Sequence, residues 1–298
     1  MTTDGFILLV PKPGLEPGRG VTPLVFETSA STIPPLRHIM GYYSNWNTRH
    51  GAPMLAHITA GEESPTRLFI LGLYARHEVR LLSILYRLLS SRAMRHRAVS
   101  ELVYWTLAYP SAKWGIAGTP LSPVELEGFL KQGSRVAVGP CRCRLAHAGC
   151  SHPLETDIVI RTGFGVWTGL FPEDYREISV DEALSLCNDC HRKGLAQIAY
   201  AHLDTGSGGS YFVICNCCSD GCLPLLSRAH YGTDRYPFHR GLMRSYVHAA
   251  GCEGCGRCVE VCPFEERTVG EDGKARVGRC YGCGLCVTHC PSGASRFV

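Results

Sequence analysis

Hydrophobic residues recur at helical spacing between residues 66 and 109, and arginines occupy much of the surface between them. The apolar positions are Leu81, Leu82, Leu85, Leu88 and Leu89, and the basic ones are Arg76, Arg80, Arg87, Arg92, Arg95 and Arg97. This pattern predicts a basic amphipathic helix. Three roles fit it: packing on its own domain with a solvated basic face, docking an acidic redox partner, or lying on a membrane surface.

Two further helices have clear start signals. Pro123–Lys131 follows Ser122, a good N-cap, and has proline at its first position. Val180–Lys193 follows Ser179, which fits a capping box with Glu182. Both helices are therefore predicted from local chemistry alone.

Apolar runs beside glycine, proline or cysteine predict short strands. They are Phe6–Val10, Pro23–Phe26, Arg135–Val138, Asp157–Ile160 and Tyr211–Ile214. Residues 223–250 are expected to be a connecting segment. The aromatic segment Tyr42–Asn47 either lines a site or packs under a loop.

The elements predict an α+β protein with several domains. Residues 1–65 form an N-terminal loop and strand segment, and residues 66–133 form a helical segment. Residues 134–240 form a mixed α/β, cysteine-rich metal-binding domain. Residues 241–298 form a separate C-terminal module.

The C-terminal module repeats one cysteine motif. CEGCGRCVEVCP begins at Cys252, and CYGCGLCVTHCP begins at Cys280. Both have the spacing C-x-x-C-x-x-C-x-x-x-C-P, which is typical of bacterial ferredoxins with two [4Fe–4S] clusters. Three thiolates at two-residue intervals wrap one cluster, and the fourth ligand comes from the opposite repeat. The predicted sets are Cys252, Cys255, Cys258 and Cys290 for cluster I, and Cys280, Cys283, Cys286 and Cys262 for cluster II.

This module resembles the two-cluster ferredoxin family at all eight ligand positions. The resemblance implies a small pseudo-twofold α+β module that transfers single electrons at low potential. A structural zinc site is the alternative for paired C-x-x-C motifs. A disulfide framework is a further alternative, but nothing in the chain suggests export.

The composition of the chain limits which cellular compartment and which classes of partner we expect. The chain has 298 residues, a formal net charge of +4 and 17 cysteines. This charge predicts no nucleic-acid partner. The N-terminus lacks the basic region of an export signal, and no apolar run of about 18 residues predicts a membrane span. So many cysteines then indicate metal rather than disulfides, in a reducing cytoplasm and an anaerobic metabolism.

Nine cysteines lie outside the C-terminal repeats: Cys141, Cys143, Cys150, Cys187, Cys190, Cys215, Cys217, Cys218 and Cys222. The groups that begin at Cys141 and Cys215 each follow a predicted strand, and neighbouring strand ends would bring them together. Arg142 and Arg144 would offset thiolate charge. We expect a third iron–sulfur cluster here. Alternatively, some of these cysteines are small buried apolar side chains.

Residues 134–298 also resemble a broad group of cysteine-rich iron–sulfur proteins of anaerobic metabolism. The matching residues are Cys141–Arg144, Glu182-Ala183-Leu184, Gly194-Leu195 and Cys215–Cys218. The resemblance implies iron–sulfur redox chemistry and no particular substrate. The chain departs from the group's pattern at Ser219–Cys222 and at Asp157, where another cysteine is expected. A site with three cysteines and Asp, His or an open iron is therefore an alternative.

Two other motifs suggest different cofactors. Cys187-Asn-Asp-Cys190-His191 matches the c-type haem attachment motif. Two alternatives to haem attachment are open for His191. It lies near the C-terminus of a helix, where a protonated histidine stabilises the helix dipole, or it binds iron or zinc together with Cys190. Gly163–Gly169 and Gly206–Gly209 are weak candidates for nucleotide loops, because the first has no clear helix after it and the second lacks a P-loop lysine. A flavin bound by other residues is left open.

These features favour an iron–sulfur electron-transfer protein. Its C-terminal module would relay electrons to or from a cysteine-ligated centre in the middle domain, as a subunit or partner of a larger redox enzyme. Two other hypotheses are an oxidoreductase that reduces a small molecule at an open-site third cluster, and an iron–sulfur scaffold or redox sensor.

Overall fold

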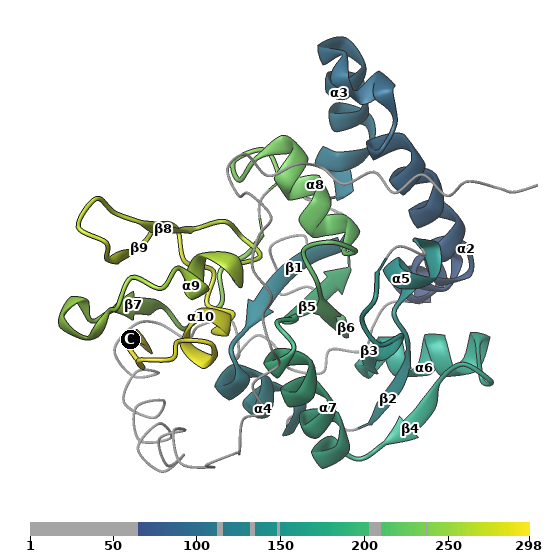
Figure 1. Cartoon of the computed structure of the whole chain (residues 1–298). Coiled ribbons are helices and arrows are strands. Elements are labelled where there is room, and N and C mark those ends of the chain that lie inside the picture. The colour runs from purple at the N-terminus through teal and green to yellow at the C-terminus, as the bar shows by residue number, and fades with distance from the viewer. Residues whose placement is uncertain (1–64, 112–115, 132–134, 148–149, 203–209, 237) are drawn as a thin grey trace, which may run out of the picture. The chain divides into compact units, whose positions relative to one another are not determined.

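The computed structural model describes residues 65–111, 116–131, 135–147, 150–202, 210–236 and 238–298 (Figure 1). All of them belong to one compact unit, Pro53–Val298. The expected strands Phe6–Val10 and Pro23–Phe26, the aromatic segment Tyr42–Asn47 and the glycines Gly206–Gly209 lie outside the described residues.

Six strands form one sheet in the order β1-β5-β6-β3-β2-β4. Their bounds are β1 Ile116–Leu121, β2 Val136–Pro140, β3 Glu155–Ile160, β4 Arg176–Ile178, β5 Ala196–His202 and β6 Ser210–Cys217. Every neighbouring pair is antiparallel. Because β2 and β6 both pair with β3, they run in the same direction and end at the same edge of the sheet.

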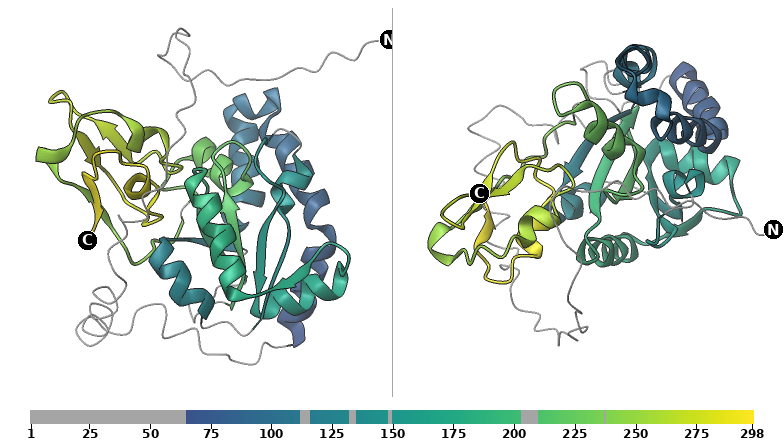
Figure 2. Two further views of the ribbon diagram at one scale, coloured as in Figure 1. Left: turned by 60° about the horizontal axis from the view of Figure 1, so that its bottom comes forward. Right: turned by 45° about the horizontal axis from the view of Figure 1, so that its top comes forward.

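Helices cover both faces of this sheet (Figure 2). The α-helices before the C-terminal segment are α2 Pro65–Leu89, α3 Arg97–Val103, α4 Pro123–Lys131, α5 Arg142–Ala146, α6 Arg161–Leu170, α7 Val180–Arg192 and α8 Leu223–Tyr231. The described residues also form short 3-10 turns at Arg92–Arg95 and Ala249–Gly251 and a π-helical turn at Tyr104–Ala108. Helix α7 packs on β2, β3, β5 and β6 beside α4, whereas α6 packs on β2, β3 and β6 beside α2.

The alternation of strand residues places these helices on opposite faces. On β3, Ile158 and Ile160 enter the core with α4 and α7, while Val159 enters the core with α2 and α6. On β2, Val138 lies in the core with α4 and α7, and Ala137 lies in the core with α2 and α6. This period of two is what a strand buried on both faces requires.

Both capped helices are confirmed. At the start of α4, the backbone N–H of Ser122 donates to Glu125 Oε2 at 2.8 Å, and Glu125 N–H donates to Ser122 Oγ at 3.3 Å. At the start of α7, Glu182 N–H donates to Ser179 Oγ at 3.1 Å. The bonds are reciprocal at α4 and single at α7, and they satisfy N–H groups that the first helical turn leaves unpaired.

Two sequence expectations are wrong. Residues 223–250 are not merely a connection, because they contain α8 and the strand β7 (Ser245–Val247). The sequence also gave no clear helix at the weak nucleotide-loop candidate Gly163–Gly169, whereas its glycines lie inside α6. Glycine disfavours helices in isolation, so local propensity gave no helical expectation there. A Cβ at Gly163 would collide with the carbonyl of Phe212, so close helix–strand packing requires glycine at this position.

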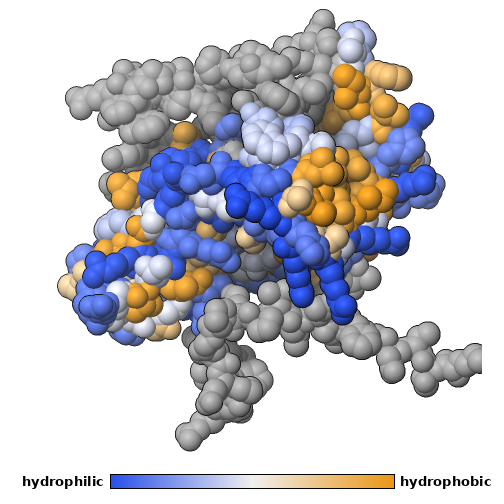
Figure 3. Space-filling view, turned by 90° about the horizontal axis from the view of Figure 1, so that it is seen from above, coloured by the Kyte–Doolittle hydropathy of each residue, from blue (hydrophilic) through white to orange (hydrophobic). Residues whose placement is uncertain are grey.

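The first part of the predicted basic helix is confirmed as α2, which packs on its own domain through a stripe that includes Leu71, Ala75 and Leu82. The helix ends at Leu89, so the last three predicted arginines lie beyond it, in the 3-10 turn and at the start of α3. Phe69 and Ile84 nevertheless remain 72% and 53% exposed. Hydrophobic side chains gather in patches between hydrophilic ones on the face seen in Figure 3. None of the helices in the described ranges is long and apolar enough to cross a membrane.

The C-terminal segment contains two small antiparallel pairs, β7 with β10 and β8 with β9. The elements are β7 Ser245–Val247, α9 Arg257–Glu260, β8 Arg267–Val269, β9 Ala275–Val277, α10 Leu285–Thr288 and β10 Ser295–Phe297. Its buried Phe264, Tyr281 and Leu285 belong to the same hydrophobic cluster as Trp167 on α6. The expected combination of helices and strands is confirmed, and the structure shows that the sheets are antiparallel. The division into separate domains stays a prediction. β1 and α4 precede the predicted boundary at residue 133 yet pack with the sheet that follows it.

Replacing Gly163 by alanine should destabilise the protein, because the added Cβ meets the Phe212 carbonyl. Overpacking of this kind costs about 1–3 kcal/mol. Gly165→Ala, two residues along the same helix, is the matched control, since no atom lies within 4 Å of its added Cβ. The control should gain up to about 1 kcal/mol from helix propensity. Anaerobic thermal unfolding of the two variants checks this, and equal midpoints would contradict it.

Candidate metal centres

The two C-terminal cysteine motifs have matching backbone conformations. Gly256, with φ of 74°, precedes α9, and Gly284, with φ of 84°, precedes α10. Only glycine adopts this left-handed region without strain. The two turns place Cys258 and Cys286, both buried, at corresponding positions of the two short helices.

Hydrogen-bond donors point at the sulfurs of these motifs. Three backbone N–H groups donate at 3.4–3.5 Å: Ala275 to Cys252, Ser295 to Cys290 and Ser245 to Cys280. Such bonds stabilise thiolates and tune the potential of a cluster that they hold. The donor set therefore fits a cysteine-ligated cluster with negative charge on its sulfurs.

A buried arginine reaches the same sulfurs. Arg267 is 4% exposed, and its Nη2 lies 2.9 Å from Cys286 Sγ and 2.6 Å from Ser245 Oγ. Its Nη1 is buried with no hydrogen-bond partner, and no carboxylate among the described residues forms an ion pair with it. A buried cation needs an anion nearby, and a cluster with thiolate ligands supplies one.

A family model described as a 4Fe-4S dicluster domain matches residues 244–291. This segment is a ferredoxin-type 4Fe-4S segment. All 17 cysteines of the chain are free in the structure, so the eight cysteines of the ferredoxin segment are available as ligands. Comparison of the chain with curated proteins and with solved structures gave no match. The wider resemblance of residues 134–298 stays a prediction.

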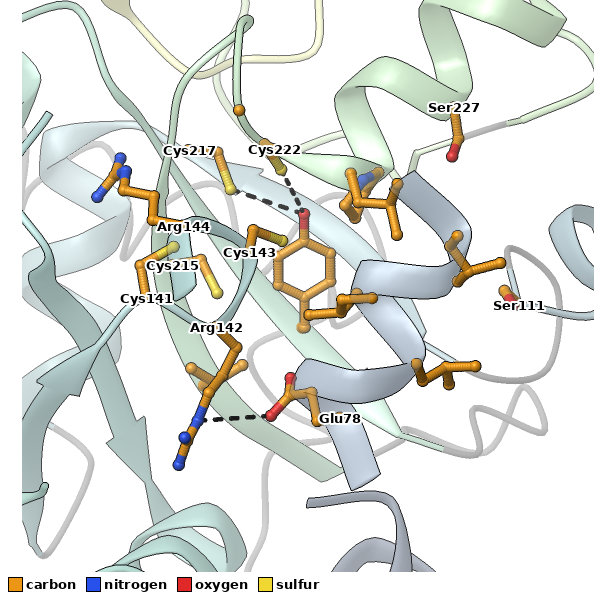
Figure 4. A pocket seen from close by; sticks show the side chains of 18 of the residues that line it. Glu78, Ser111, Cys141, Arg142, Cys143, Arg144, Cys215, Cys217, Cys222 and Ser227 are labelled. Atoms are coloured by element: carbon orange, nitrogen blue, oxygen red, sulfur yellow. Dashed lines mark hydrogen bonds and ion pairs between the residues drawn. The ribbon is translucent and has the colours of Figure 1, made fainter. Parts of the chain in front are cut away.

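The nine other cysteines separate into three groups. Five line a cavity of about 140 Å³ on the α2 and α6 side of the sheet: Cys141, Cys143, Cys215, Cys217 and Cys222 (Figure 4). Cys218 also reaches this cavity, but its sulfur lies 3.4 Å from that of Cys150. Cys187 and Cys190 are both buried on α7. Cys187 belongs to the core of the opposite face, whereas Cys190 packs in one cluster with Cys218 and Cys150. The structure thus brings the groups that begin at Cys141 and Cys215 together, as their positions after strands suggested.

Strand register produces this arrangement. β3 lies between β2 and β6, and Asp157 is paired with Gly139 on one side and with Cys215 on the other. Cys141 directly follows the end of β2, and Cys217 ends β6. Cys215 donates its S–H to Asp157 Oδ1 at 3.0 Å. A cysteine-rich sheet edge with one carboxylate in its middle is the result.

The cavity favours neutral thiols until a metal binds. Burial raises the pKa of Cys222, and a hydrogen bond with Cys222 raises the pKa of Cys143. Burial also raises the pKa of Asp157 to about 6. Because metal ligands are thiolates, loading this site with metal must release protons.

Two buried arginines of α5 flank the cavity cysteines. Arg142 forms an ion pair of 3.7 Å with Glu78, whose pKa burial raises to about 8 (Figure 4). Its Nε and Nη2 have no hydrogen-bond partner. Arg144 donates to Thr156 Oγ1 at 2.5 Å and points Nη2 at Cys218 Sγ, 3.8 Å away. With Glu78 protonated at neutral pH, Asp157 is the carboxylate whose charge still interacts with that of Arg142.

His191 has a structural role instead of the roles that the sequence suggested. Its Nδ1 lies 2.7 Å from Gln197 Oε1, and its Nε2 lies 2.9 Å from Thr288 Oγ1 of the ferredoxin segment. Neither ring nitrogen is left for a haem or another metal. Burial lowers the pKa of His191 to about 4, so it is neutral rather than a cation at the helix end.

Sequence reasoning missed several residues of these sites. Glu78 looked like one acidic residue in a basic helix, and Arg267 stood outside every motif. Asp220 carried a usable hint, because it lies between Cys218 and Cys222. Their roles depend on contacts across long stretches of sequence, which residue spacing does not reveal.

Arg267→Met should lower the reduction potential of the ferredoxin segment. The change removes a positive charge and an N–H donor at 2.9 Å from Cys286 Sγ, both of which favour the reduced, more negative cluster. A shift on the order of 60 mV is expected, since 59 mV corresponds to 1.4 kcal/mol for one electron. Anaerobic EPR redox titration measures it. Arg276→Met, which removes an exposed arginine, is the control, and equal shifts in both variants would refute the assignment.

His191 should make stability depend on pH. Its pKa is about 4 in the folded state and about 6.5 when unfolded, so stability is lost as pH falls from about 6.5 to about 4. Between pH 7 and pH 5 this loss should reach about 1–2 kcal/mol. His191→Gln should remove that portion. Denaturant midpoints of both proteins at the two pH values provide the measurement, and an undiminished loss in the variant would argue against it.

Proposed function

We propose that this protein transfers electrons between two [4Fe–4S] clusters in its ferredoxin segment and a third cysteine-ligated cluster in the cavity. The two clusters would use the crosswise ligand sets that the repeat spacing predicts. The observation that carries the proposal is the gathering of five cysteines around one cavity beside the ferredoxin segment.

The number and spread of these cysteines suit a cluster better than a single ion. Each thiolate of a cubane binds a different iron atom, so its ligands stand further apart than those of one ion. Among the described residues, the cavity cysteines form no group within reach of one ion, and neither do those of the ferredoxin segment. Five thiols are enough to supply the three or four ligands of a cluster.

The charges around the cavity also support an anionic occupant. Arg142 is buried, its partner Glu78 has a raised pKa, and two of its nitrogen atoms lack hydrogen bonds. Arg267, beside Cys286 in the ferredoxin segment, also has a buried nitrogen atom without a hydrogen-bond partner. A thiolate-ligated cluster would satisfy each arginine, since its net charge is negative.

A row of packed aromatic rings joins the two regions. Ring centroids are 4.6 Å apart for Tyr281 and Phe264, 5.6 Å for Phe264 and Phe238, and 6.2 Å for Phe238 and Tyr236. Tyr281 lies between Cys280 and Cys283, while Tyr236 lines the cavity. Contacts of this kind are tightly packed, with no intervening solvent. They support electron exchange between the ferredoxin segment and the cavity.

We further propose that the chain works with a larger redox enzyme in a reducing cytoplasm. Arg76, Arg80 and Arg87 are exposed on α2 and would face an acidic partner. An anionic membrane surface is the competing occupant of this basic face.

A second candidate is an oxidoreductase that reduces a small molecule at an open iron of the third cluster. Asp157, at 3.0 Å from Cys215, favours it, because a weak carboxylate ligand leaves an iron more accessible than a thiolate does. A cavity near 140 Å³ can admit a molecule about the size of benzene. EPR signals that change when a small substrate is added would distinguish this enzyme from a relay.

Iron and acid-labile sulfide counts test the third cluster. Three [4Fe–4S] clusters give about twelve iron atoms per anaerobically purified chain. Cys215→Ser/Cys217→Ser should fall to about eight, because it removes two of the cavity thiols. Cys187→Ser, a buried thiol on the opposite face, should retain the full count. A double variant that keeps all its iron would rule out the cavity as a cluster site.

A further inference from the structure

Cys150 and Cys218 form a second, smaller site with His152 and Asp220. The four possible ligand atoms, two sulfurs, one imidazole nitrogen and one carboxylate oxygen, all lie within 4.8 Å of one another. Among the described residues, this is the one group of cysteine, histidine and acidic side chains that is compact enough for a single ion.

The surrounding structure holds this group in place. Arg144 donates to the Pro153 carbonyl at 2.6 Å and to the Asn216 carbonyl at 2.8 Å. It thereby ties the segment that carries His152 to the end of β6, next to Cys218. Gly221 lies so close that a Cβ there would meet atoms of Cys150 and Cys218 at 3.1–3.3 Å.

We propose that Cys150, His152, Cys218 and Asp220 bind one zinc ion, separate from the iron–sulfur clusters. Two thiolates, one imidazole and one carboxylate form a tetrahedral set of the kind that Zn²⁺ prefers. Binding would release the two thiol protons to solvent. Four protein ligands close the coordination shell, so the ion is structural and fastens residues 150–153 to the rim of the cavity.

The distances between these side chains favour a zinc site over a disulfide or a cubane cluster. A disulfide needs sulfurs about 2.05 Å apart, whereas the two sulfurs lie 3.4 Å apart. A cubane would need its ligands spread around four irons. Cys218 is 4% exposed and Asp220 is exposed, so the ion is anchored inside yet reachable from solvent. This inference goes beyond the proposed electron transfer, which keeps five cavity cysteines.

Metal analysis of the full chain, purified anaerobically from zinc-supplemented cells and dialysed against a weak chelator, tests the site. The wild type should retain about one zinc per chain. The zinc content of His152→Ala/Asp220→Ala should be at least tenfold lower than that of the wild type, while its iron content stays unchanged. His77→Ala/Asp174→Ala, which removes an exposed histidine and an exposed aspartate elsewhere, is the matched control and should keep its zinc.

Zinc-edge X-ray absorption gives a second readout that the iron clusters do not obscure. Two sulfur ligands at about 2.3 Å and two nitrogen or oxygen ligands at about 2.0–2.1 Å are expected. A wild type without zinc, iron in place of zinc, a Cys150–Cys218 disulfide, or full zinc retention in the double variant would each overturn the proposal. Loss of zinc with intact iron counts separates this site from the third cluster, whose test depends on iron alone.

Discussion

The antiparallel pairing of β3 with both β2 and β6 is the constraint on which the cysteine-rich region depends. It makes β2 and β6 end at one edge of the sheet, where Cys141 follows β2, Cys217 ends β6 and Asp157 of β3 lies between them. A slip of one residue would turn Cys215 and Cys217 to the opposite face, toward α7. The buried isoleucines Ile158 and Ile214 fix the register, because they must enter the core between the sheet and α4 and α7.

The second recurring feature is the pairing of buried arginine with cysteine sulfur. Arg267 does this in the ferredoxin segment, and Arg144 does it at the rim of the cavity. Burying a guanidinium without an anion costs several kcal/mol, so these arginines make the apo form unfavourable. Metal loading and folding should therefore be coupled in both regions, as they are in other small metal-binding domains.

Local sequence signals predicted the parts of the fold that depend on local chemistry. Ser122 and Ser179 cap helices as expected, and the strands at β2, β3 and β6 follow apolar runs. Helix α6 was not predicted, because glycine has a low helix propensity. Gly163 is required there by its close contact with Phe212. The repeat spacing identified the ferredoxin segment at once. The separation of Cys150 and Cys218 from the cavity cysteines depends on how Arg144 joins distant segments, and no spacing rule contains that information.

The central claim is that the cavity at the sheet edge holds a third iron–sulfur cluster. Anomalous diffraction at the iron edge, from crystals grown without oxygen, locates iron directly. The account predicts two iron centres within residues 244–298 and a third among the five cavity cysteines, Cys141, Cys143, Cys215, Cys217 and Cys222. Iron confined to the two C-terminal centres, with the cavity free of anomalous signal in fully loaded protein, would contradict it.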